Sequence, residues 1–333
     1  MMRILMSALM MTAACAANAS DRVALIIGNS AYESITALEN PKNDANALAE
    51  TLASLGFKVT KAHDASHDDM RRAIKTFGND LQKAGSDGVG LFYYAGHGVQ
   101  VGGANYLLPV NADVADVSDL SVEGVHIDLN MHQMSHARLA ASFIIIDACR
   151  NNPYKGSVTL PPGLAQIRAP RKSIVAFSTE PGGVASDGNG EANSPYTAAL
   201  LAEITRPGYP AEIMFKRVRR TLLEETFSTQ ISWESSSLTE DFFFVQGSTA
   251  SPEAKTEFPP RPQLTVDWDD YDWEEMSSSE QRHWAVLGWD EDSWDEGAYE
   301  PASESKIWND LTSAEQAAAK ALGYTKDIWD GTG

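Results

Sequence analysis

Two residues of this chain, Cys149 and His97, have the side-chain chemistry of a thiol-based acyl transfer. An imidazole can take the proton of a thiol or stabilise the thiolate, which then attacks a carbonyl carbon. His97 stands between Gly96 and Gly98, and Cys149 follows closely on an apolar run. A lone cysteine would most simply be a small buried side chain, but together with His97 it predicts a nucleophile and its base.

The residues before His97 and Cys149 have the composition of buried β-strands. We predict strands over residues 88–94 and 142–147, and the second contains an Ile-Ile-Ile run with no polar alternation, as in a strand covered on both faces. In an open α/β sheet, ligands bind at the edge where the carboxyl ends of the strands meet. We therefore expect both side chains at this edge.

From residue 21 to residue 246, short β-branched runs alternate with longer amphipathic stretches. This pattern is typical of β-α-β units, and it predicts a three-layer α/β domain with a mostly parallel, six-stranded sheet. The expected strands are 22–28, 57–61, 88–94, 142–147, 172–178 and 241–245, and the expected helices are 44–55, 67–83, 195–204 and 211–225. Residues 155–171 contain three prolines without periodicity, so we expect an exposed loop between a large part, 21–154, and a small part, 172–246.

A linker over residues 247–262 leads to a tail, 263–333, in which two similar segments follow each other at an offset of 35 residues. Internal repetition of this kind predicts two copies of one small unit. Each copy has a capping box, at Ser277 and at Thr312, and a glycine that can end the helix. The repeated tryptophans either form the core of the unit or are exposed to stack on a ligand such as a surface glycan.

The net charge of −20 is concentrated in this tail, since residues 250–333 hold 20 acidic and 6 basic residues. Such a balance makes nucleic-acid phosphate an unfavourable partner. Two other clusters are weak metal candidates. His132 and His136 have the spacing of one helix face, with His126 nearby, but no Glu follows His132 as in zinc peptidases, so we expect a solvated face. Asp272 stands where a calcium-binding EF-hand loop needs glycine.

The first 19 residues are typical of a secretory signal peptide, with Arg3, an apolar run and the A-x-A site Ala17-Asn18-Ala19. The chain is therefore expected to be periplasmic or secreted. Two alternatives are a lipid anchor at Cys15 and an unstructured cytosolic start. No other stretch approaches the ~20 apolar residues of a transmembrane helix. A chain cleaved after residue 19 would retain only Cys149, so no internal disulfide is expected.

With these motifs in order, the sequence resembles the caspase-like cysteine peptidases, in particular the bacterial relatives of paracaspases and metacaspases known as orthocaspases. The resemblance covers about residues 22–246. Its motifs are residues 23–29 (VALIIGN), 38–45 (LENPKNDA), 55–59 (LGFKV), 93–98 (YYAGHG), 105–111 (NYLLPVN), 147–150 (DACR) and 194–197 (SPYT). The histidine also lies 52 residues before the cysteine, close to the spacing of caspases.

The resemblance implies a role for each matching residue. Cys149 would be the nucleophile and His97 the general base, with the backbone N–H groups of Gly98 and Cys149 as the oxyanion hole. Asp44 and Asp147 match acids that bind a basic substrate residue in metacaspases and paracaspases, so cleavage after Arg or Lys is expected. The residues alone leave an alternative for each acid. Asp44 could instead cap the helix that follows it, and Asp147 could serve only to accept hydrogen bonds from loop amides.

Further expectations follow from this resemblance. Residues 173–187 should form another wall of the pocket, to which Asp187 could contribute. The segment after His97 lacks the dense acidic loop of calcium-dependent metacaspases, so no cofactor is expected. Calcium activation is possible through scattered acidic residues but is not expected. Caspase-like enzymes often carry an activation cut after the nucleophile strand. The basic residues in that region are Lys155, Arg168, Arg171 and Lys172.

Two functions remain open from the sequence. The first is an endopeptidase acting on polypeptide substrates, which the presence of both Cys149 and His97 favours. The second is a catalytically silent caspase-fold interaction module, in which the tail binds a partner or a glycan. Turnover of peptides that differ only in the residue before the scissile bond distinguishes the two.

Overall fold

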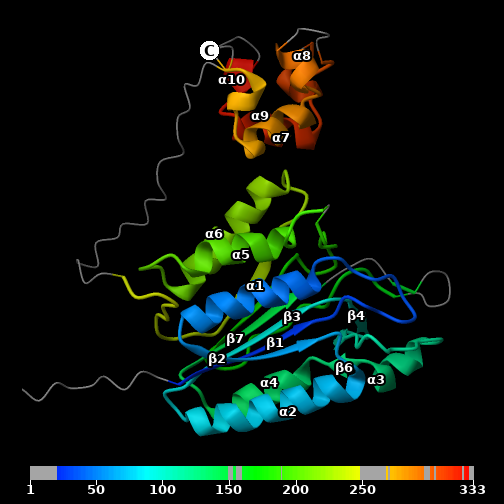
Figure 1. Ribbon diagram of the computed structural model, residues 1–333, viewed down its shortest axis with the longest axis vertical. Helices are drawn as coiled ribbons and strands as arrows, with labels where there is room; N and C mark the ends of the chain where they lie inside the picture. Colours follow the sequence, from blue (N-terminus) through cyan, green and yellow to red (C-terminus); the bar gives the residue numbers. More distant parts are fainter. Residues whose placement is uncertain are drawn as a thin grey trace, which may run out of the picture.

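The structure of this chain is a computed structural model, shown in Figure 1. It describes residues 21–148, 153–154, 160–188, 190–247, 268, 271–295, 301–303, 305–324 and 326–329. Cys149, Lys155 and the first 20 residues lie outside the described residues.

The central element is a six-stranded sheet with the order β2-β1-β3-β7-β8-β9. Its strands are β1 (Arg22–Gly28), β2 (Phe57–His63), β3 (Val89–Ala95), β7 (Ala141–Asp147), β8 (Ser173–Phe177) and β9 (Trp233–Ser236). The first five are parallel, and β9 is antiparallel to β8. The prediction of a mostly parallel six-stranded sheet is confirmed.

Helices cover both faces of this sheet, which gives three layers (Figure 1). The helices α1 (Pro41–Ser54), α5 (Pro195–Ile204) and α6 (Ala211–Glu225) pack on one face, and α2 (His67–Ala84) and α4 (Asp128–Ala137) pack on the other. Successive strand residues point to opposite faces, so Tyr93 and Ile145 enter the α1 side while Tyr94 and Ile146 enter the α2 side. Both layers are apolar because the strands are buried on both faces.

The sixth strand was predicted wrongly at residues 241–245, since the structure has no strand there and forms β9 at Trp233–Ser236 instead. The guanidinium of Arg22 donates to the carbonyl oxygens of Phe243 and Phe244, so these carbonyls bind a side chain rather than a neighbouring strand. The rings of Phe242 and Phe244 each lie 4.9 Å from the ring of Phe143. The aromatic run is therefore an apolar cover over the core.

A second, three-stranded sheet follows His97 directly. It consists of β4 (Gly98–Val101), β5 (Ala104–Leu107) and β6 (Val125–His126), all antiparallel. A 3-10 turn, η1 (Val117–Asp119), and a short helix, α3 (Leu120–Glu123), connect β5 to β6. Residues 155–171 were predicted to form an exposed loop. In its described part, residues 160–171, the loop packs partly near this sheet, since Leu164 is buried and Ala165 exchanges two hydrogen bonds with the Asn105 side chain.

The described part of the tail forms two segments with the same order of elements. The first has η3 (Trp273–Glu275), α7 (Ser278–Val286) and α8 (Glu291–Asp295), and the second has η4 (Trp308–Asp310), α9 (Ser313–Ala321) and α10 (Lys326–Trp329). Both expected capping boxes are present, at Ser277 and Thr312. Trp284 and Trp308 are buried in a shared aromatic cluster, so these two tryptophans are core residues.

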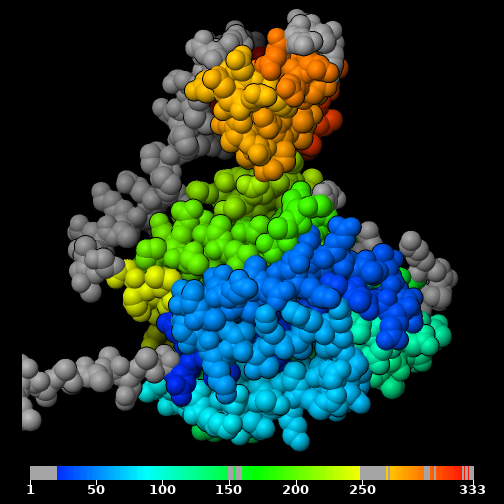
Figure 2. Space-filling view, viewed as in Figure 1, coloured from blue at the N-terminus to red at the C-terminus, as the bar shows by residue number. Residues whose placement is uncertain are grey.

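The tail contacts the α/β domain just beyond α6, and it forms a separate lobe beside that helix (Figure 2). Phe227 packs against the aromatic cluster, its ring 4.9 Å from His283 in an edge-on arrangement. Nη2 of Arg282 lies 3.4 Å from Oε2 of Glu225. Phe227 and Ser228 both have positive φ angles, 50° and 61°, a conformation that costs side-chain-bearing residues energy. No helix among the described residues combines the length and the apolar character needed to cross a membrane.

Candidate active site

The two strands that lead to the candidate catalytic residues are neighbours in the sheet. β3 and β7 pair in parallel, with Ala95 opposite Asp147. His97 follows Ala95 by two residues, and Cys149 follows Asp147 by two residues in the sequence. Beyond the ladder, the N–H of Gly96 still donates to the carbonyl of Asp147 at 3.3 Å. The register therefore delivers His97 to the edge at which β7 ends.

The imidazole of His97 is buried, with 4% of the residue exposed. Its Nε2 lies 2.8 Å from the carbonyl oxygen of Thr36. A carbonyl only accepts, so Nε2 carries the proton and Nδ1 holds the lone pair in the neutral ring. A base with this tautomer accepts a proton at Nδ1 and shares the resulting positive charge with the Thr36 carbonyl.

The loop that supplies Thr36 is fixed by a carboxylate. Asp64 Oδ1 accepts the N–H groups of Ser30 and Ala31, each at 2.9 Å, and Oδ2 binds the Lys42 ammonium at 2.9 Å. Partial burial opposes the charged form of Asp64, but these hydrogen bonds and the Lys42 charge outweigh it and lower its pKa. The loop over residues 30–38 is further closed by the N–H of Leu38 on the Ser30 carbonyl.

Gly98, the expected oxyanion residue, opens β4 against the residue that precedes Cys149. A Cβ atom added to Gly98 would lie 3.0 Å from the Cβ of Ala148 and 3.4 Å from Leu164. The structure thus brings Gly98 and Ala148 into contact. A side chain at position 98 would crowd the strand end, which explains a glycine after His97.

The carboxylates of Asp44 and Asp147 are both fully buried and are bridged by Ser194. Asp44 Oδ1 accepts from the Asn193 amide and from the Ser194 N–H, each at 2.9 Å. Asp147 Oδ2 accepts from the hydroxyls of Ser194 and Thr197. The second oxygen of each, Oδ2 of Asp44 and Oδ1 of Asp147, has no hydrogen-bond partner among the described residues. Each carboxylate therefore has one buried oxygen whose hydrogen-bonding capacity the described residues leave unused.

This environment favours a proton on the pair. Burial, and after it the negative charge of Asp147, raises the pKa of Asp44 to about 8, although the hydrogen bonds from Asn193 and Ser194 act in the opposite direction. Two buried carboxylates so placed do not both ionise easily. A positively charged group beside the two carboxylates would allow both to ionise.

The hydrogen bonds of the two acids differ from those of their alternative roles, which were helix capping by Asp44 and binding of loop amides by Asp147. The N-cap of α1 is Asn40, and Asp44 uses its side chain on Asn193 and Ser194 rather than to cap the helix. Among the described residues, Asp147 accepts from two hydroxyls and not from loop amides.

Asp187 lies where the loop after β8 meets the start of α1. Its carboxylate accepts the N–H of Glu39 at 2.7 Å and that of Asn40 at 3.4 Å. Farther along the chain, Gln230 holds the same loop, because its amide donates to the Ser178 carbonyl at 2.8 Å and accepts the Ser186 N–H at 2.9 Å. The loop that bears Asp187 is thus anchored at both ends.

Three of the four candidate cleavage positions lie in the described part of the chain. Arg168 and Arg171 are exposed. Lys172 is half-buried, has a φ of 57°, and accepts the Ser142 N–H with its carbonyl. Backbone around Arg168 is tied down, since the Ala169 N–H donates to the Ser235 hydroxyl at 3.1 Å.

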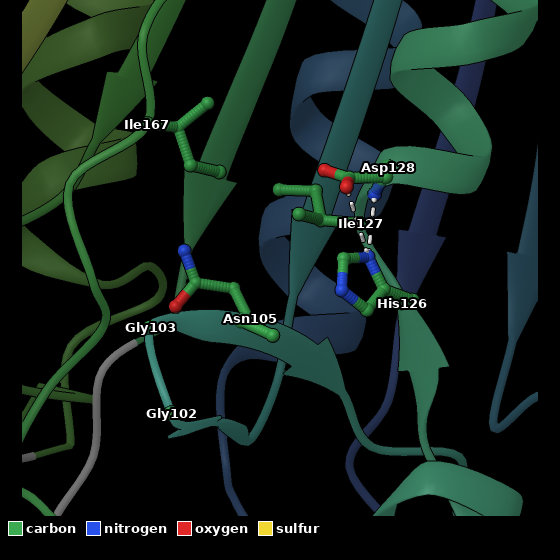
Figure 3. Close-up of a pocket in the computed structure, with 8 residues that line it drawn as sticks. Gly102, Gly103, Asn105, His126, Ile127, Asp128 and Ile167 are labelled. Carbon is green, nitrogen blue, oxygen red and sulfur yellow. Dashed lines mark hydrogen bonds and ion pairs between the residues drawn. The ribbon is translucent and has the colours of Figure 1, made fainter.

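A separate pocket of about 230 Å³ lies at the tip of the β4–β5 hairpin and is drawn in Figure 3. His126 and Asp128 line it, with Asn105 and Ile167 on the facing side, and neither His97 nor the two buried acids do. Nδ1 of His126 accepts the Asp128 N–H at 3.1 Å. His132 and His136 are exposed on α4, and the described residues contain no group of three or more metal-ligating side chains.

Sequence reasoning missed the partners of the predicted residues. The Thr36 carbonyl belongs to the backbone, which carries no side-chain signal. Ser194 and Thr197 lie within the SPYT motif, and the short spacing between a helix-capping serine and a threonine one turn later was the available signal. Tyr93 adds a third hydroxyl, 2.6 Å from Thr197.

A parallel sheet that carries a glycine-flanked histidine on one strand end and leads to a cysteine on the next is the framework of a caspase-type domain. Comparison with known families agrees, because the family described as Caspase domain matches residues 21–243. The chain belongs to this family, as the sequence resemblance predicted.

Among curated proteins, the chain is similar to the human mucosa-associated lymphoid tissue lymphoma translocation protein 1, with 31% identity over 165 residues. The mouse homologue is 30% identical over the same length. The match covers 48% of this chain and 19% of the human protein. The chain therefore spans about a fifth of the relatives that it matches.

The raised pKa of Asp44 predicts a pH-dependent stability. A folded-state pKa of about 8 against an ordinary 3.8 means that this group's contribution is fully present below about pH 3.8 and is lost as the pH rises through about 8. Asp44→Asn removes the titration. We expect the stability of the variant relative to wild type to improve between pH 5 and pH 8, by up to ~1.4 kcal/mol per pH unit, in urea unfolding.

The matched control is Asp64→Asn, for which the sign is opposite. The pKa of Asp64 is lowered, so its contribution is present above its ordinary pKa and is lost as the pH falls through the folded-state value. This variant should therefore lose stability most at neutral pH. A stability difference for Asp44→Asn that did not change with pH would contradict the assignment.

Proposed function

We propose that this chain is a cysteine endopeptidase that cleaves polypeptides after Arg or Lys. The observation that carries the proposal is the pair Asp44 and Asp147, fully buried, with one carboxylate oxygen each that has no partner among the described residues. Asp147 ends the strand that leads to Cys149, and its neighbour in register leads to His97. The buried acidic pair and the strand ends that lead to Cys149 and His97 therefore belong to the same edge of the sheet, which supports the proposal.

In the proposed mechanism, His97 Nδ1 takes the thiol proton of Cys149, and the thiolate sulfur attacks the scissile carbonyl carbon. The Thr36 carbonyl, 2.8 Å from Nε2, stabilises the imidazolium that forms. The N–H groups of Gly98 and Cys149 bind the developing oxyanion. When the tetrahedral adduct collapses, His97 donates its proton to the leaving amine, and a thioester remains on Cys149.

The second half of the reaction reverses these roles. His97 removes a proton from water, the resulting hydroxide attacks the thioester, and the Cys149 thiolate leaves and regains a proton. No metal or organic cofactor is needed for either step. A backbone carbonyl as the partner of His97 fulfils the orienting role that a carboxylate has in other triads.

Specificity in this proposal comes from charge. An ammonium or guanidinium can donate to Oδ2 of Asp44 and Oδ1 of Asp147, and hydrogen bonds between charged groups contribute roughly 1.5–3 kcal/mol each. Because the pKa of Asp44 is raised, a bound cation also promotes the loss of its proton. An acidic substrate residue would instead add negative charge to a buried site that already holds two acids.

Two further parts of the proposal concern processing. We propose that residues 1–19 direct export to the periplasm or the exterior and are removed. We also propose self-cleavage after one of the basic residues that follow the nucleophile. The exposed side chains of Arg168 and Arg171 support this proposal, whereas the packed backbone at Ala169 requires local opening before a protease can bind there.

The primary test is turnover of fluorogenic peptides that differ only in the residue before the scissile bond. Peptides with Arg or Lys at this position should be cleaved, and those with Asp should not. Cys149→Ala and His97→Ala should each reduce kcat to a few per cent of wild type or less, because each removes a group that the acyl transfer needs. Preference for Asp, or full activity of Cys149→Ala, would refute the proposal.

The pocket is tested by Asp147→Asn, which keeps the shape of the side chain and removes its charge. We expect kcat/KM for Arg peptides to fall by ~10-fold or more, the weight of one hydrogen bond to a charged group. Asp68→Asn is the matched control, because the Asp68 side chain is 80% exposed on α2. Equal effects of the two substitutions on kcat/KM would show that the net charge of the protein, and not the pocket, determines the preference for Arg peptides.

Self-cleavage is tested by incubating the purified full chain and identifying new C-termini by mass spectrometry. Wild type should give fragments that end at Lys155, Arg168, Arg171 or Lys172, while Cys149→Ala stays intact. If the wild-type chain remains whole while it turns over peptides, it is active without this cut. Equal fragmentation of both proteins would indicate a contaminating protease.

A further inference from the structure

Tyr32, a residue that the proposed mechanism does not use, contacts His97 in two ways. Its hydroxyl accepts the backbone N–H of His97 at 2.7 Å. Its ring lies 4.7 Å from the imidazole, with an angle of 59° between the planes. Only 8% of Tyr32 is exposed. One side chain therefore contacts both the backbone and the ring of the candidate base.

A second tyrosine continues this network. The hydroxyl oxygens of Tyr32 and Tyr94 are 3.2 Å apart, and the Tyr94 hydroxyl lies 2.8 Å from the carbonyl of His97 and 2.9 Å from that of Leu108. Tyr94 is fully buried. The peptide groups on both sides of His97 are thus bound to hydroxyls, through N–H on one side and C=O on the other.

The glycine before His97 is explained by the same two hydroxyls. Gly96 has a φ of 152°, and a Cβ atom there would lie 2.6 Å from the Tyr32 hydroxyl oxygen and 2.7 Å from that of Tyr94. Any side chain at this position would displace one of the tyrosines. The space beside Gly96 is therefore occupied by the groups that hold His97.

Tyr32 belongs to the same loop as Thr36, whose carbonyl accepts from Nε2 of His97. The loop is closed at Ser30, which accepts the N–H groups of Tyr32 and Leu38. Asp64 fixes the beginning of this loop through Ser30 and Ala31. A single anchored loop therefore sets the backbone position, the ring plane and the tautomer of His97.

We propose that Tyr32 is a positioning residue for the general base. It acts through His97: its hydroxyl fixes the His97 backbone and its ring fixes the imidazole plane, so that Nε2 stays on the Thr36 carbonyl while Nδ1 accepts the proton. The inference rests on the proposed function in that His97 is the base.

The test is Tyr32→Phe, which keeps the ring and removes the hydroxyl. We expect kcat for an Arg peptide to fall about tenfold, the weight of one hydrogen bond, while KM changes less than twofold because the acids of the pocket are untouched. Tyr106→Phe is the matched control, since the Tyr106 ring also packs against that of a histidine, His126, with the ring centroids 5.0 Å apart. This control should keep wild-type kcat.

A second measurement distinguishes positioning from a merely structural role. The ¹⁵N chemical shifts of the His97 ring report its tautomer and its pKa during a pH titration. Wild type and Tyr106→Phe should show one tautomer with the proton on Nε2. Tyr32→Phe should show a mixture of tautomers, and the acidic limb of its kcat/KM profile should shift.

The outcomes separate the two proposals. If no peptide is cleaved, the proposed function fails, and the His97 shifts still test the role of Tyr32. Unchanged shifts and kcat in Tyr32→Phe would overturn the inference, as would a rise in KM alone. Should Tyr32→Phe not fold, Tyr94→Phe removes the neighbouring hydroxyl, and the same mixture of tautomers is expected. An unmixed tautomer in Tyr94→Phe would then count against the proposal.

Discussion

The parallel pairing of β3 with β7 is the constraint on which the rest of this molecule depends. With Ala95 opposite Asp147, the residues that follow both strands emerge at one edge. The register also decides direction, because side chains alternate between faces along a strand. Asp147 follows Phe143 and Ile145 by even steps and therefore points, as they do, to the α1 and α5 side. A slip by one residue would turn it away.

The helices on that side complete the buried acidic pair. α1 contributes Asp44 from its first turn, and the capping serine of α5, Ser194, bridges the two carboxylates. Burial of two acids is unfavourable unless their charge is reduced by a proton or balanced by a cation. The raised pKa of Asp44 shows the first solution. At neutral pH the fold thus keeps a proton on this pair.

The sequence predicted the elements whose burial leaves a pattern. β1, β3 and β7 are continuous apolar runs, and α5 and α6 have their predicted bounds. β9 was missed because a four-residue polar edge strand, WESS, has neither apolar alternation nor length. The Phe-rich run at 242–244 has the composition of a strand, but its carbonyls bind Arg22 instead.

The candidate site was predictable to the same degree. His97, Asp44 and Asp147 are side chains in recognisable motifs, and the structure brings the two acids onto a common serine. The groups that orient them were not predictable, because the Thr36 carbonyl is backbone and the contact of Tyr32 with His97 crosses 65 residues. Such partners are determined by how loops return to the sheet.

The turn after α6 contacts two other parts of the chain, the tail and the loop that bears Asp187. Phe227, in its left-handed conformation, packs into the tail, and three residues later Gln230 clamps the loop that bears Asp187. An inserted residue would break one contact or the other, so the length of this turn is fixed. At the β4–β5 hairpin, Cβ atoms on Gly102 and Gly103 would meet nothing within 4 Å. The β4–β5 hairpin can therefore vary in length, whereas the turn after α6, which contacts both the tail and the loop that bears Asp187, cannot.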